Sequence, residues 1–236
     1  ASYLMEYDAL MSLFEATMPE GTTLPSESEL EDAIVETLIN KTAIRQLADE
    51  YDVQIDSDNV EEYYQDILTS QESEEAFAEE LMNTFGWTTE AFKSRIIESI
   101  VLALQMTDFV LESDVIQTER FESIETAYQR LESGEEFDLV AKEVHASIDS
   151  TLESDLGYVQ QSVISEGWAS AVEALEMDAY SQIQMLDEGY AIFKLIDRVT
   201  DEEEVKVHLM AITVPKKSLE EFVEEFLDEA SVKRYL

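Results

Sequence analysis

The side chains that could do chemistry in this chain are carboxylates, hydroxyls and two histidines, His145 and His208. Because there is no cysteine, thiolate chemistry and cysteine metal sites are excluded, and two histidines are too few for a histidine-rich metal site. The 55 acidic residues place paired carboxylates everywhere, so no acid–base dyad can be singled out, and no calcium-loop pattern is present. We therefore expect neither a metal nor a cofactor.

The stretch from Phe137 to Phe193 is the most informative part of the chain. It contains an amphipathic helical pattern, FDLVAKEVHAS, then an acidic and polar loop that ends in ESDLGYVQ. A short segment with a tryptophan, SEGWASAVEALE, precedes a strand with period-two alternation, GYAIFKLIDRV. His145 closes the helical pattern, where a charged ring would suit the helix C-terminus, and a role in catalysis is the alternative.

This order of residue types and distances resembles the parvulin family of peptidyl-prolyl isomerases. In the family a helix with the pattern G-x-x-F-x-x-L-A packs on an antiparallel sheet, and GEEFDLVAKEV matches this pattern. The G-D-L-G motif that follows in the family is SDLG here. The resemblance implies a small α+β domain that acts on proline-containing polypeptides.

The resemblance also implies an apolar pocket for a proline ring. Leu156, in SDLG, occupies the position of a pocket leucine, and Ile164 and Trp168 take the places of a methionine and a phenylalanine. These replacements keep the pocket apolar, which burial of a pyrrolidine ring requires. A plain core residue is the alternative for Trp168.

The polar part of the family's site is altered in this chain. Ser147 corresponds to a cysteine or aspartate near the rotating amide, and Ala191 replaces the second histidine of a buried pair. His208, in VKVHLMAI, fits the first histidine, so we expect it beside Ala191 and behind Ser147. An ordinary strand histidine is the alternative. With Ser147 and His208 as the remaining catalytic candidates, we expect weak or absent isomerase activity.

The position of VKVHLMAI in the chain differs from the family's order. The family places its first-histidine strand before the helix, whereas VKVHLMAI follows the last strand through the polar turn DRVTDEEE. Two successive strands joined by a short polar turn predict an antiparallel hairpin. We therefore expect the C-terminal strand to supply the missing one, as in a circular permutation. The alternative is that VKVHLMAI begins a second, truncated domain.

The first half of the chain has helical periodicity. A helix is expected over residues 3–14, and after the loop PEGTTLPSES further helices are expected to begin near Ser28, Ser57, Ser73 and Thr88. Residues 27–112 resemble the N-terminal chaperone domain of SurA-type and PrsA-type folding factors. The match is clearest in the segment DVQIDSDNV, which lies between two expected helices. An unrelated helical bundle is the alternative.

Two domains are therefore predicted. Residues 1–113 form a helical, chaperone-like domain, to which the last helix in residues 217–236 can return. Residues 114–216 form the parvulin-like domain, whose antiparallel sheet includes the C-terminal strand.

The net charge of −41 limits the possible partners. So acidic a chain is repelled by nucleic-acid phosphates and by anionic membrane surfaces, and no apolar run is long enough for a membrane span. A solvated surface, adaptation to high salt and attraction of cationic clients all remain open as reasons for the charge.

We expect an extracytoplasmic folding factor that acts on unfolded or proline-containing polypeptides. This location follows from the resemblance and agrees with the absence of cysteine. The sequence begins inside a helical pattern, so an export signal or membrane anchor is expected upstream of it. The alternatives are a non-enzymatic module that binds peptides or partner proteins, and an assembly protein of the cell envelope.

Overall fold

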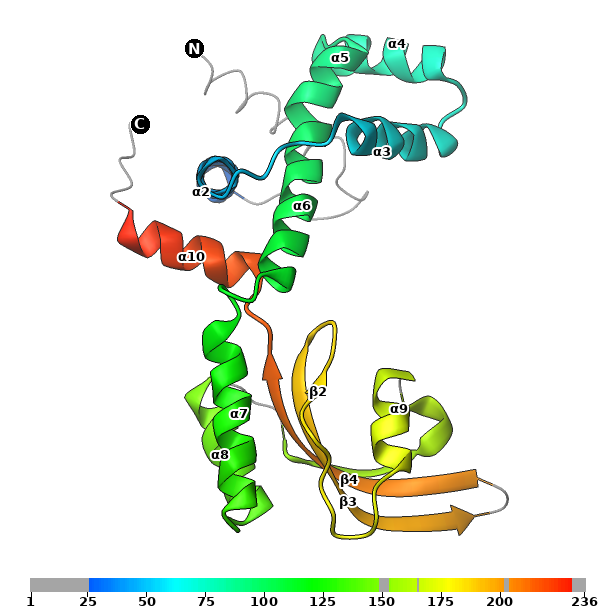
Figure 1. Ribbon diagram of the computed structural model, residues 1–236. Helices are drawn as coiled ribbons and strands as arrows, with labels where there is room; N and C mark the ends of the chain where they lie inside the picture. Colours follow the sequence, from blue (N-terminus) through cyan, green and yellow to red (C-terminus); the bar gives the residue numbers. More distant parts are fainter. Residues whose placement is uncertain (1–25, 149–152, 165, 202–203, 231–236) are drawn as a thin grey trace. The chain divides into compact units, whose positions relative to one another are not determined.

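The computed structural model describes residues 26–148, 153–164, 166–201 and 204–230, which fall into two compact units (Figure 1). One unit contains residues 26–109 and 219–230, and the other is Val110–Ser218. The helix predicted over residues 3–14 lies outside the described residues. None of the helices in the described ranges combines the length and the apolarity that a bilayer crossing requires.

The first unit is built from helices. They are α2 (Glu27–Glu50), α3 (Ser57–Thr69), α4 (Glu74–Phe85), α5 (Thr89–Phe92), a π-helical turn (Lys93–Ile97), most of α6 (Glu98–Glu112), and α10 (Leu219–Glu229). Side chains at the N-terminal ends accept hydrogen bonds from the first turns, including those of Ser26, Ser73 and Thr88. Gly86 ends α4 in the left-handed conformation, with a φ of 67°.

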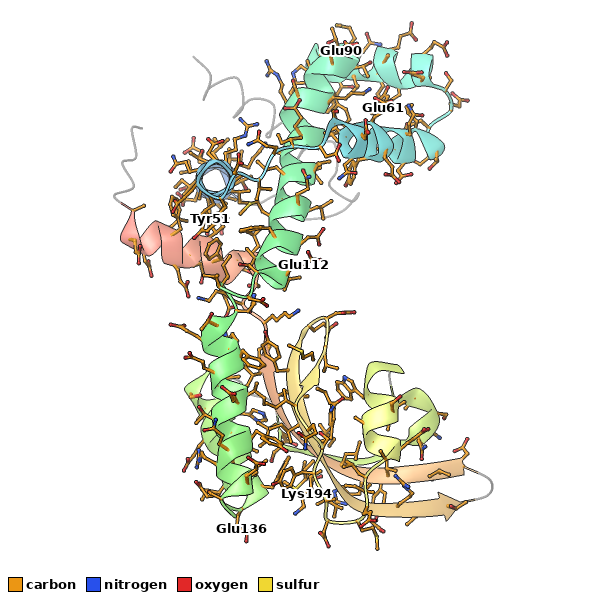
Figure 2. All side chains as sticks on the ribbon, viewed as in Figure 1. Tyr51, Glu61, Glu90, Glu112, Glu136 and Lys194 are labelled. Atoms are coloured by element: carbon orange, nitrogen blue, oxygen red, sulfur yellow. The ribbon has the colours of Figure 1, made fainter. Side chains whose placement is uncertain are left out.

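Two apolar clusters hold this unit together. In one of them α10 packs on α2 and α6, with Val223 buried against Leu47 and Met106. The ring of Tyr51, labelled in Figure 2, contacts one aromatic ring of α6 and one of α10. Its centroid lies 5.4 Å from that of Phe109 and 5.7 Å from that of Phe222. The other cluster joins α3, α4 and the π-helical turn through buried aliphatic and aromatic residues, which are Tyr64, Leu81, Trp87, Phe92, Ile97 and Val101.

The second unit has a four-stranded antiparallel sheet in the order β1-β4-β3-β2. Its elements are α7 (Thr118–Glu132), α8 (Phe137–Ser147), β1 (Asp155–Gln160), a 3₁₀ turn (Gln161–Val163), α9 (Glu166–Glu173), β2 (Gln184–Met185), β3 (Gly189–Asp201) and β4 (Glu204–Pro215). The C-terminal strand β4 lies between β1 and β3, so it completes this sheet and does not begin another domain. The predicted α+β class and the permuted strand order are confirmed.

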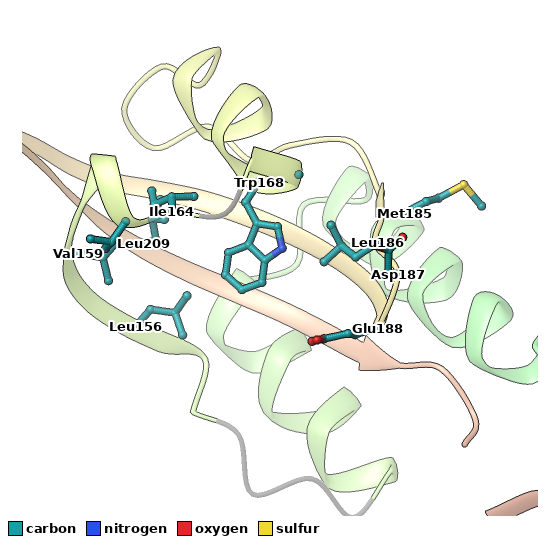
Figure 3. Close-up of a pocket in the computed structure, with 11 residues that line it drawn as sticks. Leu156, Val159, Ile164, Trp168, Met185, Leu186, Asp187, Glu188 and Leu209 are labelled. Atoms are coloured by element: carbon teal, nitrogen blue, oxygen red, sulfur yellow. The ribbon is translucent and has the colours of Figure 1, made fainter. Parts of the chain in front are cut away.

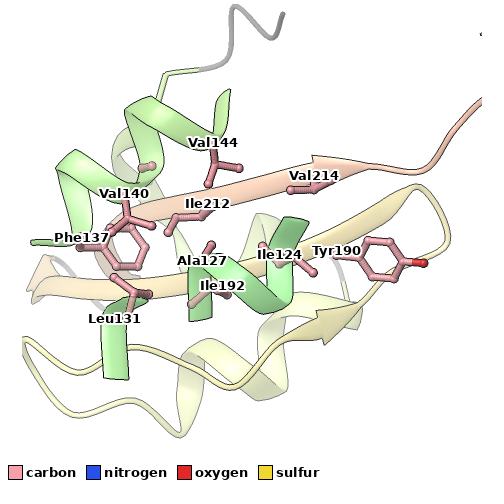
Figure 4. Close-up of a cluster of buried hydrophobic side chains, with 11 residues drawn as sticks. Ile124, Ala127, Leu131, Phe137, Val140, Val144, Tyr190, Ile192, Ile212 and Val214 are labelled. Carbon is pink, nitrogen blue, oxygen red and sulfur yellow. The ribbon is translucent and has the colours of Figure 1, made fainter. Parts of the chain in front are cut away.

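Each face of the sheet carries its own apolar cluster. Tyr190, Ile192, Ile212 and Val214 face α7 and α8, where they bury Ile124, Val140 and other helix residues (Figure 4). The alternate strand positions face α9 on the other side, and this second set consists of Ala191, Phe193, Leu195, Val207, Leu209 and Ala211. The period of two along β3 and β4 therefore assigns each side chain to one face.

A buried glutamine joins the two ends of this unit. The amide nitrogen of Gln117 donates to the carbonyl of Val110 at 2.8 Å and to that of Lys217 at 3.0 Å. The backbone N–H of Lys217 donates in return to the amide oxygen of Gln117 at 2.8 Å. The segment that enters the unit is thus fixed to the segment that leaves it.

Two segments differ from the sequence-based expectation. DLGYVQ, expected in a loop, forms the edge strand β1, because β4 offers it a ladder of backbone partners. YSQIQML, whose period-two alternation predicts a strand, contributes only β2 and an isolated bridge between Tyr180 and Lys194.

Candidate functional site

A pocket of about 600 Å³ opens on the face of the sheet that α9 covers (Figure 3). The three residues predicted for a proline pocket, Leu156, Ile164 and Trp168, all line it. In Figure 3 the ring of Trp168 stands between Ile164 and Leu186. The remaining lining residues come from β1, the 3₁₀ turn, α9, β2, the β2–β3 turn and β4, and are Val159, Val163, Gly167, Met185, Leu186, Asp187, Glu188 and Leu209.

Leu156 reaches the pocket from a bulge in β1. Asp155 pairs with Met210 and Gly157 with Leu209, so Leu156 is the extra residue between two ladder pairs. Gly157 has a φ of 65°, and its N–H donates to the carboxylate of Asp155 at 2.9 Å. The SDLG motif therefore builds a local turn that presents a half-exposed leucine.

Trp168 belongs to both the pocket and the core. Its ring packs on Phe193 with centroids 4.8 Å apart, within the cluster on this face of the sheet. The same ring lines the pocket. The two alternatives for Trp168 therefore do not exclude each other, and its core contact fixes the ring that the pocket presents.

The interior of the pocket is apolar, apart from the indole N–H of Trp168. Charges occur only where Asp187 and Glu188 line it, at the turn that joins β2 to β3. Such a surface can bind an apolar group by removing it from water. The lining residues alone supply neither a nucleophile nor a histidine.

His208 does not face the pocket. In β4 it alternates with Val207 and Leu209, which lie in the cluster on the pocket face. Its Nε2–H donates to Asp155 at 2.7 Å, and its ring lies 5.0 Å from that of Tyr158. The N–H of Gly157 and the ring of His208 together lower the pKa of the Asp155 carboxyl below its usual value.

Tyr158 extends this polar group along the same face. Its hydroxyl donates to Asp197 at 2.6 Å, and this hydrogen bond raises the pKa of the Tyr158 phenol. Asp197 is also the ladder partner of His208. His208 therefore contributes to a polar cluster whose connection to the pocket runs through Asp155 and the bulge.

The expectation that His208 lies beside Ala191 is wrong. Ala191 pairs with Thr213, and His208 pairs with Asp197. The ladder between β3 and β4 runs from the pair Asp201 and Glu204 to the pair Gly189 and Pro215, and this register places His208 well away from Ala191 along the hairpin. The residue near Ala191 on the same face is Ala211, which is also buried.

Ser147 is also separate from the pocket. It is the last residue of α8, whose buried residues pack on the opposite face of the sheet. Its hydroxyl donates to the carbonyl of Val144 at 2.7 Å, and it lines a different hollow of about 490 Å³ together with Arg130 and Glu143. Within the described residues, no hydrogen bond joins Ser147 to His208, so the predicted arrangement of these two side chains is not found.

His145 has a structural contact. Its ring is buried, and its Nε2 accepts a hydrogen bond from the backbone N–H of Thr213 at 3.1 Å. An accepting nitrogen carries a lone pair, so the ring that makes this bond is neutral. His145 thus joins α8 to the C-terminal part of β4, beyond the residues of β4 that pair with β1.

Sequence reasoning missed several pocket residues. Val159, Leu186 and Leu209 complete the apolar wall, and Asp187 and Glu188 form its charged edge. For Leu209 a signal was available. Leu209 follows His208 directly in VKVHLMAI, and neighbouring residues of a strand face opposite sides of the sheet, so only one of the two can face the pocket. For Asp187 and Glu188 no such signal exists in so acidic a chain.

Comparisons with known proteins agree with this architecture. Residues 100–197 match the rotamase family described as the PPIC-type PPIASE domain. The chain is 25% identical over 232 residues to the foldase protein PrsA of Halalkalibacterium halodurans, and this similarity covers 85% of the chain and 68% of that protein. The matched family range ends within β3 and leaves out β4. The recognition of a parvulin-type domain and of similarity to a foldase is confirmed.

Proposed function

From the premise that this chain carries a parvulin-type peptidyl-prolyl isomerase domain and is similar to a foldase, we propose that it is an extracytoplasmic protein-folding factor. It binds unfolded, proline-containing polypeptides at the pocket of Leu156, Ile164 and Trp168. The convergence of these three residues on one apolar pocket is the observation that carries this proposal. The extracytoplasmic location rests on the similarity to a foldase of the PrsA type.

The isomerase activity of this site is weak or absent. Rotation of a prolyl bond is opposed by the loss of amide resonance, with a barrier of about 18–20 kcal/mol. An apolar wall binds the planar and the twisted amide about equally, and such uniform binding does not accelerate rotation. Ala191 leaves no imidazole at the position of the family's second histidine, and Ser147 and His208 act elsewhere in the domain.

The helical unit supports the same activity. The similarity to PrsA spans 85% of the chain and so includes helices outside the isomerase-like domain. Half-exposed apolar side chains on this unit, including Tyr51, Met82 and Leu104, offer contacts to an unfolded client. Its role is that of a chaperone that holds polypeptides while the pocket binds a prolyl or other apolar residue.

A non-enzymatic binding module is the second candidate. Ala191 and Ala211 are both buried on the pocket face of the sheet, so no imidazole pair can form there. On this alternative the pocket serves to bind a peptide or a partner in envelope assembly. Binding would then be the whole activity of the domain.

One experiment on the full chain separates these functions. A capped proline tetrapeptide is titrated with the protein, and binding is measured by calorimetry while cis–trans exchange is measured by NMR on the same peptide. We expect saturable binding with an exchange rate close to the uncatalysed value, whose time constant is tens to hundreds of seconds. Rapid catalysed exchange would contradict the weak activity, and a lack of binding would contradict the pocket's role in folding.

A further inference from the structure

Two carboxylates stand at one edge of the apolar pocket. Asp187 and Glu188 line it next to Met185 and Leu186, and both are exposed. Among the described residues, neither carboxylate has a hydrogen-bond or ion-pair partner. We call these two residues the acidic rim.

The backbone of the acidic rim is held in place by hydrogen bonds. The N–H of Leu186 donates to the carbonyl of Gly189 at 2.8 Å, and the N–H of Gly189 returns to the carbonyl of Leu186 at 3.3 Å. The carbonyl of Glu188 accepts from the N–H of Lys216 at 3.0 Å. Gly189 itself lies so close to β4 that a Cβ there would be 2.5 Å from the carbonyl oxygen of Val214. The backbone of the turn is therefore fixed to β4, which holds both residues of the acidic rim beside the pocket.

No lysine or arginine lines the pocket to balance this charge. An apolar surface with negative charge on one edge is complementary to a ligand that is apolar with positive charge at one end. In a polypeptide, that ligand is a lysine or arginine next to a prolyl or other apolar residue. Long basic side chains can reach a charge at the rim while the neighbouring residue stays buried.

We propose that the pocket selects polypeptide segments in which a lysine or arginine adjoins the apolar or prolyl residue that the pocket binds. This inference rests on the proposed function and defines its substrate class. The apolar residue packs against Trp168 and Leu156, and the cationic group pairs with the acidic rim. Because the rim is exposed, each pairing changes affinity by a small factor of about two to five, and salt reduces it.

The test uses the full chain and three capped tetrapeptides that differ only in the residue before proline, which is lysine, glutamine or glutamate. Affinities are measured by calorimetry at low and at high ionic strength. The variant Asp187→Asn/Glu188→Gln is compared with Glu125→Gln/Glu132→Gln on α7, which removes the same charge from exposed positions outside the pocket lining. Circular dichroism checks that both variants fold.

We expect the wild type to bind the lysine peptide about two- to fivefold more tightly than the glutamine peptide at low salt. The rim variant loses this preference but still binds the glutamine peptide, and the α7 variant keeps the preference. Equal affinities in the wild type, or an equal loss of preference in both variants, would overturn the inference while leaving the pocket's function intact. Binding of none of the peptides would overturn the proposed function as well.

Discussion

Ala191 lies directly opposite Thr213 in the ladder between β3 and β4. Ala191, which stands where the parvulin resemblance places the family's second histidine, is buried with Ala211 on the pocket face of the sheet. The histidine that the sequence offered instead, His208, supports the β1 bulge through Asp155. The pocket and the polar residues of this domain therefore serve different purposes.

We expect that a histidine introduced at position 191 does not restore catalysis. Ala191 is fully buried, so Ala191→His places an imidazole in the core beside Phe193, where the described residues of this apolar cluster offer its ring nitrogens no hydrogen-bond partner. Overpacking and an unpaired polar group each cost about 1–3 kcal/mol. We expect a clear fall in the free energy of unfolding, measured by urea denaturation, and no rise in isomerase activity.

Val199→His is the matched control for this change, because Val199 lies on the same strand and is 37% exposed. It should leave stability nearly unchanged. A stable Ala191→His protein with raised isomerase activity would show that position 191 still belongs to a working catalytic site.

The two glycines that flank the pocket should respond differently to alanine. In Gly189→Ala the new Cβ meets the backbone of Val214 and Pro215, so we expect a loss of about 1–3 kcal/mol in the free energy of unfolding. In Gly167→Ala the methyl meets only the side chain of Leu186 at 3.7 Å, and helix propensity favours a gain of up to about 1 kcal/mol. Urea denaturation measures both, and similar effects of the two substitutions would contradict the close approach of β3 to β4.

Acid should remove the contribution of Asp155. Its pKa is lowered from 3.8 in the folded protein, so its stabilising effect is complete above that value and is lost as the pH falls through the folded-state pKa. We expect the difference in melting temperature between the wild type and Asp155→Asn to be largest above pH 5 and to vanish in strong acid. Asp187→Asn, which removes an exposed carboxylate from outside the bulge, is the matched control. A difference that is constant with pH would mean that the Asp155 carboxylate contributes nothing to the bulge.

The net charge predicts a response to salt. A chain with a net charge of −41 repels itself, and screening over about 8 Å at physiological ionic strength shortens to about 3 Å at 1 M. We expect the melting temperature to rise steadily with sodium chloride. Scanning calorimetry from low salt to molar salt tests this, and a melting temperature independent of salt would argue against adaptation to high salt.

Local patterns in the sequence were sufficient to predict much of the fold. The caps at Ser73 and Thr88, the C-terminal glycine of α4 and the hairpin of β3 with β4 follow from short-range chemistry. The sheet position of the C-terminal strand followed from the resemblance, together with the short turn that joins it to β3. These features depend on residues close together in the chain or on a pattern of period two.

Register and distant packing were not predictable in the same way. The partner of Ala191 depends on where the hairpin turns and on the irregularity between Leu195 and Asp197. The strand DLGYVQ has weak alternation and becomes β1 only because β4 pairs with it. The π-helical turn at Lys93–Ile97 has no local signal that we recognise.

The central claim is that polypeptides bind at the pocket that Leu156 helps to form. Leu156→Ala and Leu139→Ala remove the same atoms from leucines that are 38% and 50% exposed, and only the first lines the pocket. Calorimetric titration with a capped proline peptide compares both variants with the wild type. We expect Leu156→Ala to weaken binding about tenfold, in line with the apolar area it removes, and Leu139→Ala to match the wild type. Equal affinity of all three proteins would contradict the account.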